Sequence, residues 1–271
     1  MINRRCFITG IKSTTLSFKE KAFLKHYKPW GVILFSRNIN SIYQIKKLTR
    51  EIRGIFKDKN YPILIDQEGG RVSRLSKFLN TDLLTSEYFG NLFIQDKKKF
   101  KKYYEIFINK TSYILKQIGI NINTVPVLDL RNKGSNNIIG DRSFSNNPKI
   151  IDRIGNFCIK KFHNNNIGTV IKHIPGHGLA KVDSHKSTPI VKVKLSHLIK
   201  KDFLTFKNKK SFFAMTAHII YNNIDKVNTA THSKKVICLI RSNIKFKNLL
   251  ISDDISMKSL KYSIKENTLK A

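Results

Sequence analysis

The chain alternates between short runs of apolar residues and longer segments in which apolar positions recur at helical spacing. Residues 31–35 (Gly-Val-Ile-Leu-Phe) and 63–65 contain no polar alternation, which is typical of strands buried on both faces of a parallel sheet. Between them, Ser41 begins a segment whose apolar residues return every three or four positions up to Ile55, and this spacing predicts an amphipathic helix. Ser41 and Gln44 form a candidate capping box at its start.

The same alternation continues along the chain and predicts seven strands. They lie at residues 6–9, 31–35, 63–65, 125–130, 167–172, 212–217 and 249–251. Further helices are expected over residues 97–118 before Gly119, from Asn147-Pro148 onward, after Ser233, and from Met257. Strands that alternate with helices predict an α/β fold with a parallel sheet.

Polar or charged clusters follow five of these strands, which favours a (β/α)8 barrel of the TIM type over an open doubly wound sheet. In a barrel all the loops after the strands converge on one face, whereas an open sheet concentrates ligand contacts at one or two crossover points. The chain also has no Gly-x-Gly-x-x-Gly segment and no phosphate-loop lysine. An eighth strand is not visible, so we expect a single domain over residues 1–271 whose barrel is truncated before that strand.

The densest group of titratable residues lies at residues 172–185, directly after the apolar run of the fifth predicted strand. Lys172 and His173 come at the end of that strand, and a proline and two glycines then force an irregular loop. The loop carries Asp183 and His185, which are close enough in sequence for the carboxylate to orient the imidazole. A lone histidine is usually structural, but core packing does not explain such a concentration of titratable groups.

Other predicted strand ends carry Asp66, Arg74, Arg142 and Asp253. Carboxylates and histidines together can hold a metal, but the neighbouring cations oppose metal binding, so we expect no metal. A carboxylate that attacks and a group that donates a proton fit better, because glycoside hydrolysis requires that pair. The arginines and aspartates around it would bind sugar hydroxyls through directed hydrogen bonds.

Charge is the unusual feature of the composition, since 51 Lys and Arg against 18 Asp and Glu give a formal net charge of +33. Such a charge usually suggests a polyanionic partner. However, the lysines are spread along the chain without a basic stripe interleaved with aromatics, a zinc-finger spacing or a helix-turn-helix signature. We therefore favour compositional drift and expect no specific nucleic-acid partner.

The cysteines and the apolar runs indicate the compartment. Cys6, Cys158 and Cys238 are far apart and odd in number, which is typical of free thiols in a reducing environment. The amino terminus lacks the apolar stretch of a signal peptide, and no run reaches the length of a membrane span. We expect a cytoplasmic protein with no membrane partner.

Six motifs occur in order along nearly the whole chain. They are Asp66-Gln-Glu-Gly-Gly-Arg-Val-x-Arg74, Gly140-Asp-Arg-Ser-Phe144, Lys172-His-Ile-Pro-Gly-His-Gly178, Asp183-Ser-His185, Met215-Thr-Ala-His218 and Ser252-Asp-Asp-Ile-Ser-Met257. Together they resemble the bacterial β-N-acetylhexosaminidases of glycoside hydrolase family 3, the peptidoglycan-recycling type. The Lys-His-x-Pro-Gly-His-Gly and Asp-Ser-His elements are the most specific.

The resemblance implies a role for each matching residue. Asp253 matches the nucleophile that forms a covalent glycosyl-enzyme intermediate, His185 matches the general acid/base, and Asp183 matches its orienting partner. The residues that match contacts to the N-acetylglucosamine unit are Asp66, Arg74, Arg142, Lys172 and His173. The implied activity is cofactor-free, retaining hydrolysis of terminal β-linked N-acetylglucosamine from cytoplasmic peptidoglycan fragments (muropeptides), so the expected partner is a small carbohydrate.

Polar neighbours of these motifs are expected to support the loops rather than to contact a ligand. They are Glu68, Arg71, His177, His218 and Asp254. An alternative role for Arg142 is that of a local ion-pair partner of Asp141.

The departure from the family pattern lies at the end of the chain. Family members continue past the nucleophile through a helix and a last strand that closes the barrel, whereas residues 257–271 are Lys-rich and offer no buried strand. We therefore expect two exposed sheet edges, or a gap filled by another chain or segment. Three alternatives stay open: a family 3 β-glucosidase, which the Asp-Ser-His dyad disfavours, a polyanion-binding protein on an inactive barrel, and a decayed enzyme that folds poorly.

Overall fold

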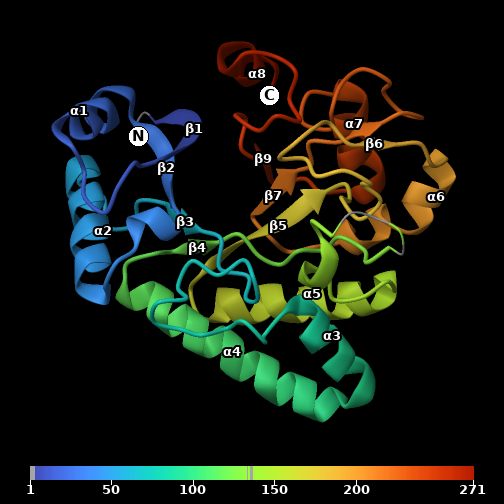
Figure 1. The fold of residues 1–271 in the computed structure, drawn as a ribbon, viewed down its shortest axis with the longest axis horizontal. Coiled ribbons are helices and arrows are strands. Elements are labelled where there is room, and N and C mark those ends of the chain that lie inside the picture. The colour runs from blue at the N-terminus through green and yellow to red at the C-terminus, as the bar shows by residue number, and fades with distance from the viewer. Residues whose placement is uncertain (1–3, 133, 135–136) are drawn as a thin grey trace.

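A parallel sheet of seven strands forms the centre of the computed structural model, which describes residues 4–132, 134 and 137–271 (Figure 1). In spatial order the strands are β1 (Arg5–Gly10), β2 (Pro29–Leu34), β3 (Ile63–Ile65), β4 (Ile122–Asn123), β5 (Gly168–Ile174), β7 (Phe213–Thr216) and β9 (Leu249–Ser252). A smaller parallel pair joins β6 (Ile190–Val191) to β8 (Ile220–Tyr221). The spatial order follows the chain and every neighbouring pair is parallel, so the predicted α/β class is confirmed.

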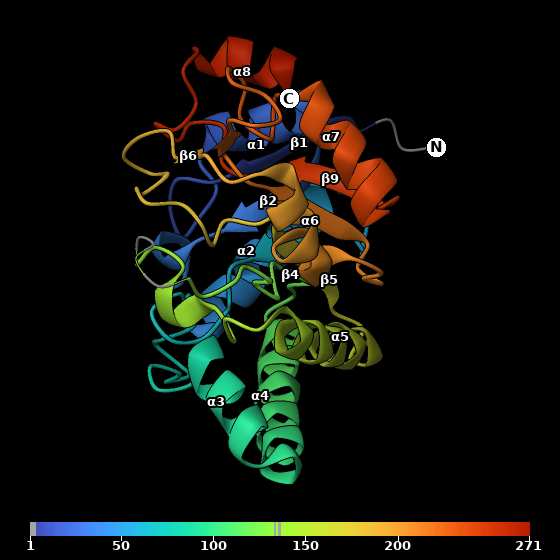
Figure 2. The ribbon, with the colours of Figure 1, turned by 90° about the vertical axis from the view of Figure 1, so that its right-hand side faces the viewer.

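Helices lie around the outside of this sheet (Figures 1 and 2). They are α1 (Phe18–Tyr27), α2 (Ile42–Phe56), α3 (Ser86–Gln95), α4 (Lys97–Gln117), α5 (Pro148–Asn164), α6 (Leu195–Lys200), α7 (Lys234–Leu239) and α8 (Ile264–Lys270). Short helical turns follow some of the loops, and a π-helical turn over Ile240–Ile244 continues α7. In the described part of the chain, none of these helices has both the length and the apolar character needed to cross a bilayer.

Side-chain caps fix the starts of two predicted helices. At α2 the Ser41 hydroxyl accepts the backbone N–H of Gln44 at 3.1 Å, as predicted. The Gln44 side chain reaches back to the N–H of Asn40 instead of Ser41, so half of the predicted capping box forms. At α5 the predicted cap is confirmed, because the Asn147 side chain accepts the N–H of Lys149.

The sheet is strongly curved. The rings of Trp30 on β2 and Phe213 on β7 lie 5.2 Å apart, although three strands separate β2 from β7 in the sheet. In a flat sheet four steps between strands would place them about 19 Å apart. The strands therefore wrap around an apolar interior that also contains Leu64, Val170 and Met215.

The strands β1 and β9 are the two ends of the sheet, and among the described residues no ladder joins them. A cavity reaches between them and is lined by Cys6 and Ile8 from β1 and by Leu249 and Ile251 from β9. In Figure 1 the two strands face one another across this opening. The structure is a half-barrel of parallel strands, and the eight-stranded form expected for a TIM barrel is not confirmed.

The strand predicted at residues 125–130 is wrong in position, because the fourth strand, β4, ends before it. This segment makes an isolated bridge between Val127 and Lys172 instead of a ladder. Pro126 has no N–H to donate, which interrupts regular pairing. Leu128 still donates its N–H to the carbonyl oxygen of Lys172 at 2.8 Å, so the segment runs beside β5.

The last predicted helix begins later than Met257. It starts at Ile264, where the Ser263 hydroxyl accepts the N–H of Glu266. The sequence pattern also does not predict α1, in which the described side chains include one buried residue, Leu24. A helix that buries so little has no apolar stripe to detect.

Candidate active site

A cavity of about 700 Å³ lies at the carboxyl ends of the strands. Seven of the predicted site residues line it, and they are Asp66, Arg74, Arg142, Lys172, His173, His185 and Asp253. The eighth, Asp183, is not part of the lining and reaches the site through its contact with His185. The fold therefore gathers the ends of β3, β5 and β9 with two loops around one space.

Asp66, directly after β3, binds two cations. One carboxylate oxygen lies 3.0 Å from Nζ of Lys172 and also accepts the Thr124 hydroxyl, while the other lies 3.4 Å from the Arg74 guanidinium. Burial alone would raise the pKa of the Asp66 carboxyl, but Lys172, Thr124 and Arg74 outweigh it and hold the pKa well below its ordinary value. Asp66 is therefore a fixed anion that can accept hydrogen bonds from a ligand.

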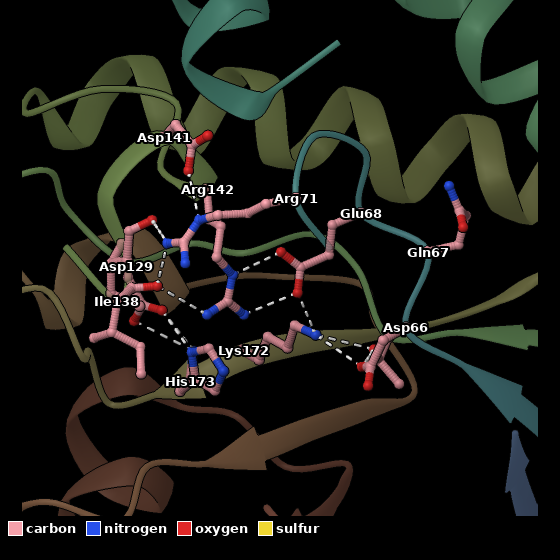
Figure 3. Close-up of polar contacts among 12 residues, drawn as sticks. Asp66, Gln67, Glu68, Arg71, Asp129, Ile138, Asp141, Arg142, Lys172 and His173 are labelled. Atoms are coloured by element: carbon pink, nitrogen blue, oxygen red, sulfur yellow. Dashed lines mark hydrogen bonds and ion pairs between the residues drawn. The ribbon is translucent and has the colours of Figure 1, made fainter. Parts of the chain in front are cut away.

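Glu68 binds two of the cavity's cations, Arg142 and Lys172, as Figure 3 shows. Its two oxygens accept Nε and Nη2 of Arg142, both at 2.8 Å, and one oxygen also lies 2.7 Å from Nζ of Lys172. Burial would raise the pKa of Glu68, but these two cations lower it to about 2. Burial would likewise lower the pKa of Lys172, but Asp66 and Glu68 raise it. Glu68 thus braces the site, as expected.

The predicted alternative for Arg142, a local ion pair with Asp141, is wrong. Asp141 binds Arg71 instead, with 2.9 Å between Oδ1 and Nε. Arg71 also donates to the carbonyl oxygen of Ile138 (Figure 3). It donates to the carbonyl oxygen of Asn137 as well. It therefore braces the loop that carries Arg142, which leaves the Arg142 guanidinium to Glu68.

Asp129 is a supporting residue that the sequence pattern does not identify. It is fully buried, and its carboxylate lies 2.7 Å from Nδ1 of His173 and accepts the backbone N–H of His177 at 2.6 Å. Burial would raise the pKa of Asp129, but the two histidines hold it below its ordinary value. The one signal in the sequence was a single acid within the apolar run at residues 125–130.

Asp183 and His185 form the pair that their spacing predicts. Oδ1 of Asp183 lies 3.0 Å from Nδ1 of His185 and accepts its backbone N–H at 2.8 Å. Slight burial would raise the pKa of Asp183, but the N–H and the ring of His185 lower it. The His185 side chain is 65% exposed and lines the cavity, so the ring edge that carries Nε2 is open to a ligand.

Asp253 follows β9 at the cavity wall. Burial would raise its pKa, but the neighbouring imidazoles of His173 and His218 and the N–H of Asp254 hold the pKa below its ordinary value. An ionised carboxylate at the cavity meets the requirement for a nucleophile. Asp254 instead accepts the N–H and the hydroxyl of Ser256, which caps a turn and agrees with a structural role.

The histidines expected to be structural are buried. His177 lies 3.2 Å from the Ser184 hydroxyl through Nε2, and burial, together with the neighbouring His173 imidazole, lowers the pKa of His177 to about 4. His218 contacts the Thr231 hydroxyl through Nδ1 and the carbonyl oxygen of Asp254 through Nε2. Within the described ranges, no three His, Cys, Asp or Glu side chains are grouped in a way that could hold a metal ion.

Comparison with known proteins decides the family. Residues 9–271 match the family described as "Glycosyl hydrolase family 3 N terminal domain". The chain belongs to glycoside hydrolase family 3. A β-hexosaminidase of Nitrosomonas eutropha is 31% identical over 258 residues, which cover 92% of this chain and 72% of that protein. A β-hexosaminidase of Hydrogenovibrio crunogenus is 30% identical over 255 residues, which cover 93% and 71%.

Solved structures give the same assignment. NagZ from Neisseria gonorrhoeae in complex with N-trifluoroacetyl-D-glucosamine matches with a TM-score of 0.88 at 29% identity, covering 99% of this chain and 78% of that one. The family 3 member described here is therefore a glycoside hydrolase whose relatives are β-hexosaminidases. The family expected from the six motifs is confirmed.

Proposed function

We propose that this chain is a retaining β-N-acetylhexosaminidase that removes terminal β-linked N-acetylglucosamine. The observation that carries the proposal is the meeting of the Asp253 carboxylate and the His185 imidazole at one cavity, beside a fixed network of charges. The names of the relatives and the sugar derivative bound by the NagZ neighbour support the choice of substrate.

The reaction proceeds in two displacements at the anomeric carbon. Asp253 attacks that carbon and forms a covalent glycosyl ester, while the His185 imidazolium gives its proton to the departing glycosidic oxygen. Neutral His185 then takes a proton from water, which attacks the same carbon and releases Asp253. Two inversions return the original configuration. Asp183, bound to Nδ1, orients the ring and stabilises its charged form.

The remaining site residues bind the sugar. Asp66 accepts hydrogen bonds from hydroxyls, and Lys172, Arg142 and Arg74 donate them. Together with Glu68, this network has two anions against three cations, so one net positive charge remains. That balance suits an uncharged sugar or one that carries a carboxylate, as muropeptide fragments do.

The biological setting follows from the family resemblance. We propose that residues 1–271 act as one catalytic domain on muropeptide fragments in the cytoplasm and that no cofactor takes part. An imidazole can donate a proton in the first step and accept one in the second, which is what the acid/base role requires.

Hydrolysis of an aryl β-N-acetylglucosaminide by the purified chain tests the proposal. Asp253→Ala and His185→Ala should each lower kcat/KM by about a hundredfold or more, because each removes a reacting group. An aryl group that leaves without protonation, such as dinitrophenolate, should restore the first step in His185→Ala but not in Asp253→Ala. Asp96→Asn, which changes an exposed cap of α4, serves as the matched carboxylate control.

Other results of the same assay would contradict the proposal or favour one of the alternatives. Turnover unchanged in Asp253→Ala would contradict the nucleophile, and preferred hydrolysis of an aryl β-glucoside would favour a β-glucosidase. No turnover by a chain that melts cooperatively would favour the inactive barrel.

A further inference from the structure

A second carboxylate–imidazole pair lies at the wall of the cavity, where His173 lines it and Asp129 is buried behind His173. The side chain of Asp129 is fully buried, and its Oδ2 lies 2.7 Å from Nδ1 of His173. The carboxylate also accepts the backbone N–H groups of His173, at 3.2 Å, and of His177, at 2.6 Å. Figure 3 shows Asp129 directed at the His173 ring. One side chain therefore holds both the ring and the backbone at the end of β5.

These contacts determine which nitrogen of His173 carries a proton. Burial would raise the pKa of Asp129, but His173 and His177 outweigh it and keep the group ionised, and an ionised carboxylate can only accept hydrogen bonds. Nδ1 of His173 must then be the donor. Nε2 lies on the opposite edge of the ring, His173 lines the cavity, and no residue in the described part of the chain binds Nε2.

We propose that Asp129 is a positioning residue that holds the proton of His173 on Nδ1, so that the bare Nε2 accepts a hydrogen bond from one hydroxyl of the bound sugar. This inference rests on the proposed function. The cations of the site supply donors, so His173 adds an acceptor that only a hydroxyl or an N–H can satisfy. A sugar without that hydroxyl would leave Nε2 unpaired, and sites built in this way discriminate strongly.

Asp129→Asn tests the role because the amide has nearly the same shape and can donate to Nδ1. His173 would then carry its proton on Nε2 and present a donor to the sugar. With a set of aryl N-acetylglucosaminides that each lack one ring hydroxyl, wild type should be slowed at least about tenfold by one particular deletion. In Asp129→Asn that penalty should shrink to within about threefold, while a purely structural role would slow all the substrates alike. Asp96→Asn should keep the wild-type pattern.

Nitrogen NMR of the substrate-free protein with labelled histidines reads the proton position without any need for activity. The signal of His173 is assigned by its loss in His173→Gln, and we expect a protonated Nδ1 and an unprotonated Nε2. A proton on Nε2, alone or together with Nδ1, would overturn the inference. The wild-type spectrum tests the position of the His173 proton even if Asp129→Asn does not fold. Because it is independent of turnover, it also separates failure of this inference from failure of the proposed function.

Discussion

The ammonium nitrogen of Lys172 lies 2.7 Å from a carboxylate oxygen of Glu68, and each side chain is 3% exposed. Both partners hold further charges, since Glu68 binds Arg142 and Lys172 binds Asp66. A buried pair contributes little net stability, but the loss of one partner leaves an uncompensated charge in a medium of low dielectric constant. The cations proposed to bind the sugar are therefore held in place by anions of the protein itself.

Glu68→Gln should lower the free energy of unfolding by about 3–5 kcal/mol, because Lys172 and Arg142 lose a shared anion. Urea unfolding followed by circular dichroism measures the change. The matched control is Glu87→Gln, whose partner Arg131 lies 3.3 Å away with both side chains about 40% exposed. The control substitution should lower the free energy of unfolding by less than about 1 kcal/mol. An equal decrease in the free energy of unfolding in the two variants would contradict this account, because the buried network would then stabilise the fold no more than an exposed ion pair.

Two groups with lowered pKa values, His177 and Glu68, make the folded state sensitive to acid. The pKa of His177 is lowered to about 4 from 6.5, so the unfolded chain takes up this proton first and stability falls as pH drops from 6.5 to 4. The pKa of Glu68 is lowered from 4.5 to about 2, so its contribution is present above pH 4.5 and is lost as pH falls towards 2. Tm measured against pH should therefore decline as pH falls below 4.5, and Glu68→Gln should flatten that decline. An unchanged slope in that variant would contradict the assignment.

Asp202 is a buried acid that forms no ion pair with any described residue. Its Oδ1 has no hydrogen-bond partner among the described residues, and burial together with the charge of Asp129 raises its pKa to about 7. The folded state therefore keeps a proton that the unfolded chain releases above 3.8, so stability is lost as pH rises towards 7. Asp202→Asn should raise the free energy of unfolding by about 2 kcal/mol in mildly alkaline buffer and change it little in acid. A lower Tm under both conditions would contradict this account.

The loop after β5 requires glycine at position 178 because there is no room for a β-carbon. A β-carbon there would lie 2.1 Å from the carbonyl oxygen of Leu130, which is backbone and cannot move aside easily. Gly178→Ala should therefore lower the free energy of unfolding by about 1–3 kcal/mol. It should also lower kcat/KM, because the same loop carries Asp183 and His185. The control is Gly54→Ala on the exposed side of α2, where no atom lies within 4 Å and a gain of about 0.5–1 kcal/mol is expected. A similar loss of stability in both variants would contradict this account, because the effect would then not depend on the space around Gly178.

The sequence predicts the strands best where a parallel strand is buried on both faces. Residues 63–65 form β3 as expected, because a continuous apolar run this short between polar neighbours cannot form a buried helix. Residues 125–130 have the same apolar character but pack beside β5 without a regular ladder, since Pro126 cannot donate. Apolar composition therefore predicts that a segment is buried. Whether that segment also pairs as a strand depends on its backbone N–H groups, and Pro126 lacks one.

The sequence predicts the Asp183–His185 pair, whose members are two residues apart, but it does not predict the pairs that join distant parts of the site. Strand ends and motifs identify Lys172 and Asp253 because such residues have no reason to follow apolar runs in a core. The partners of Arg142 and His173, which are Glu68 and Asp129, come from distant parts of the chain. Their pairing depends on how the curved sheet brings β3, β5 and the intervening segment together, and no local pattern records that curvature.

The covalent intermediate on Asp253 is the central claim, and mass spectrometry tests it most directly. A fluorinated N-acetylglucosaminyl fluoride that reacts quickly with the enzyme but hydrolyses slowly should add one sugar to the wild-type chain. Trypsin then releases residues 248–258, and fragmentation of this peptide distinguishes Asp253 from Asp254. We expect the sugar on Asp253 and no adduct in Asp253→Ala. An adduct on Asp254 or another acid, or turnover with inverted product and no adduct, would contradict the claim.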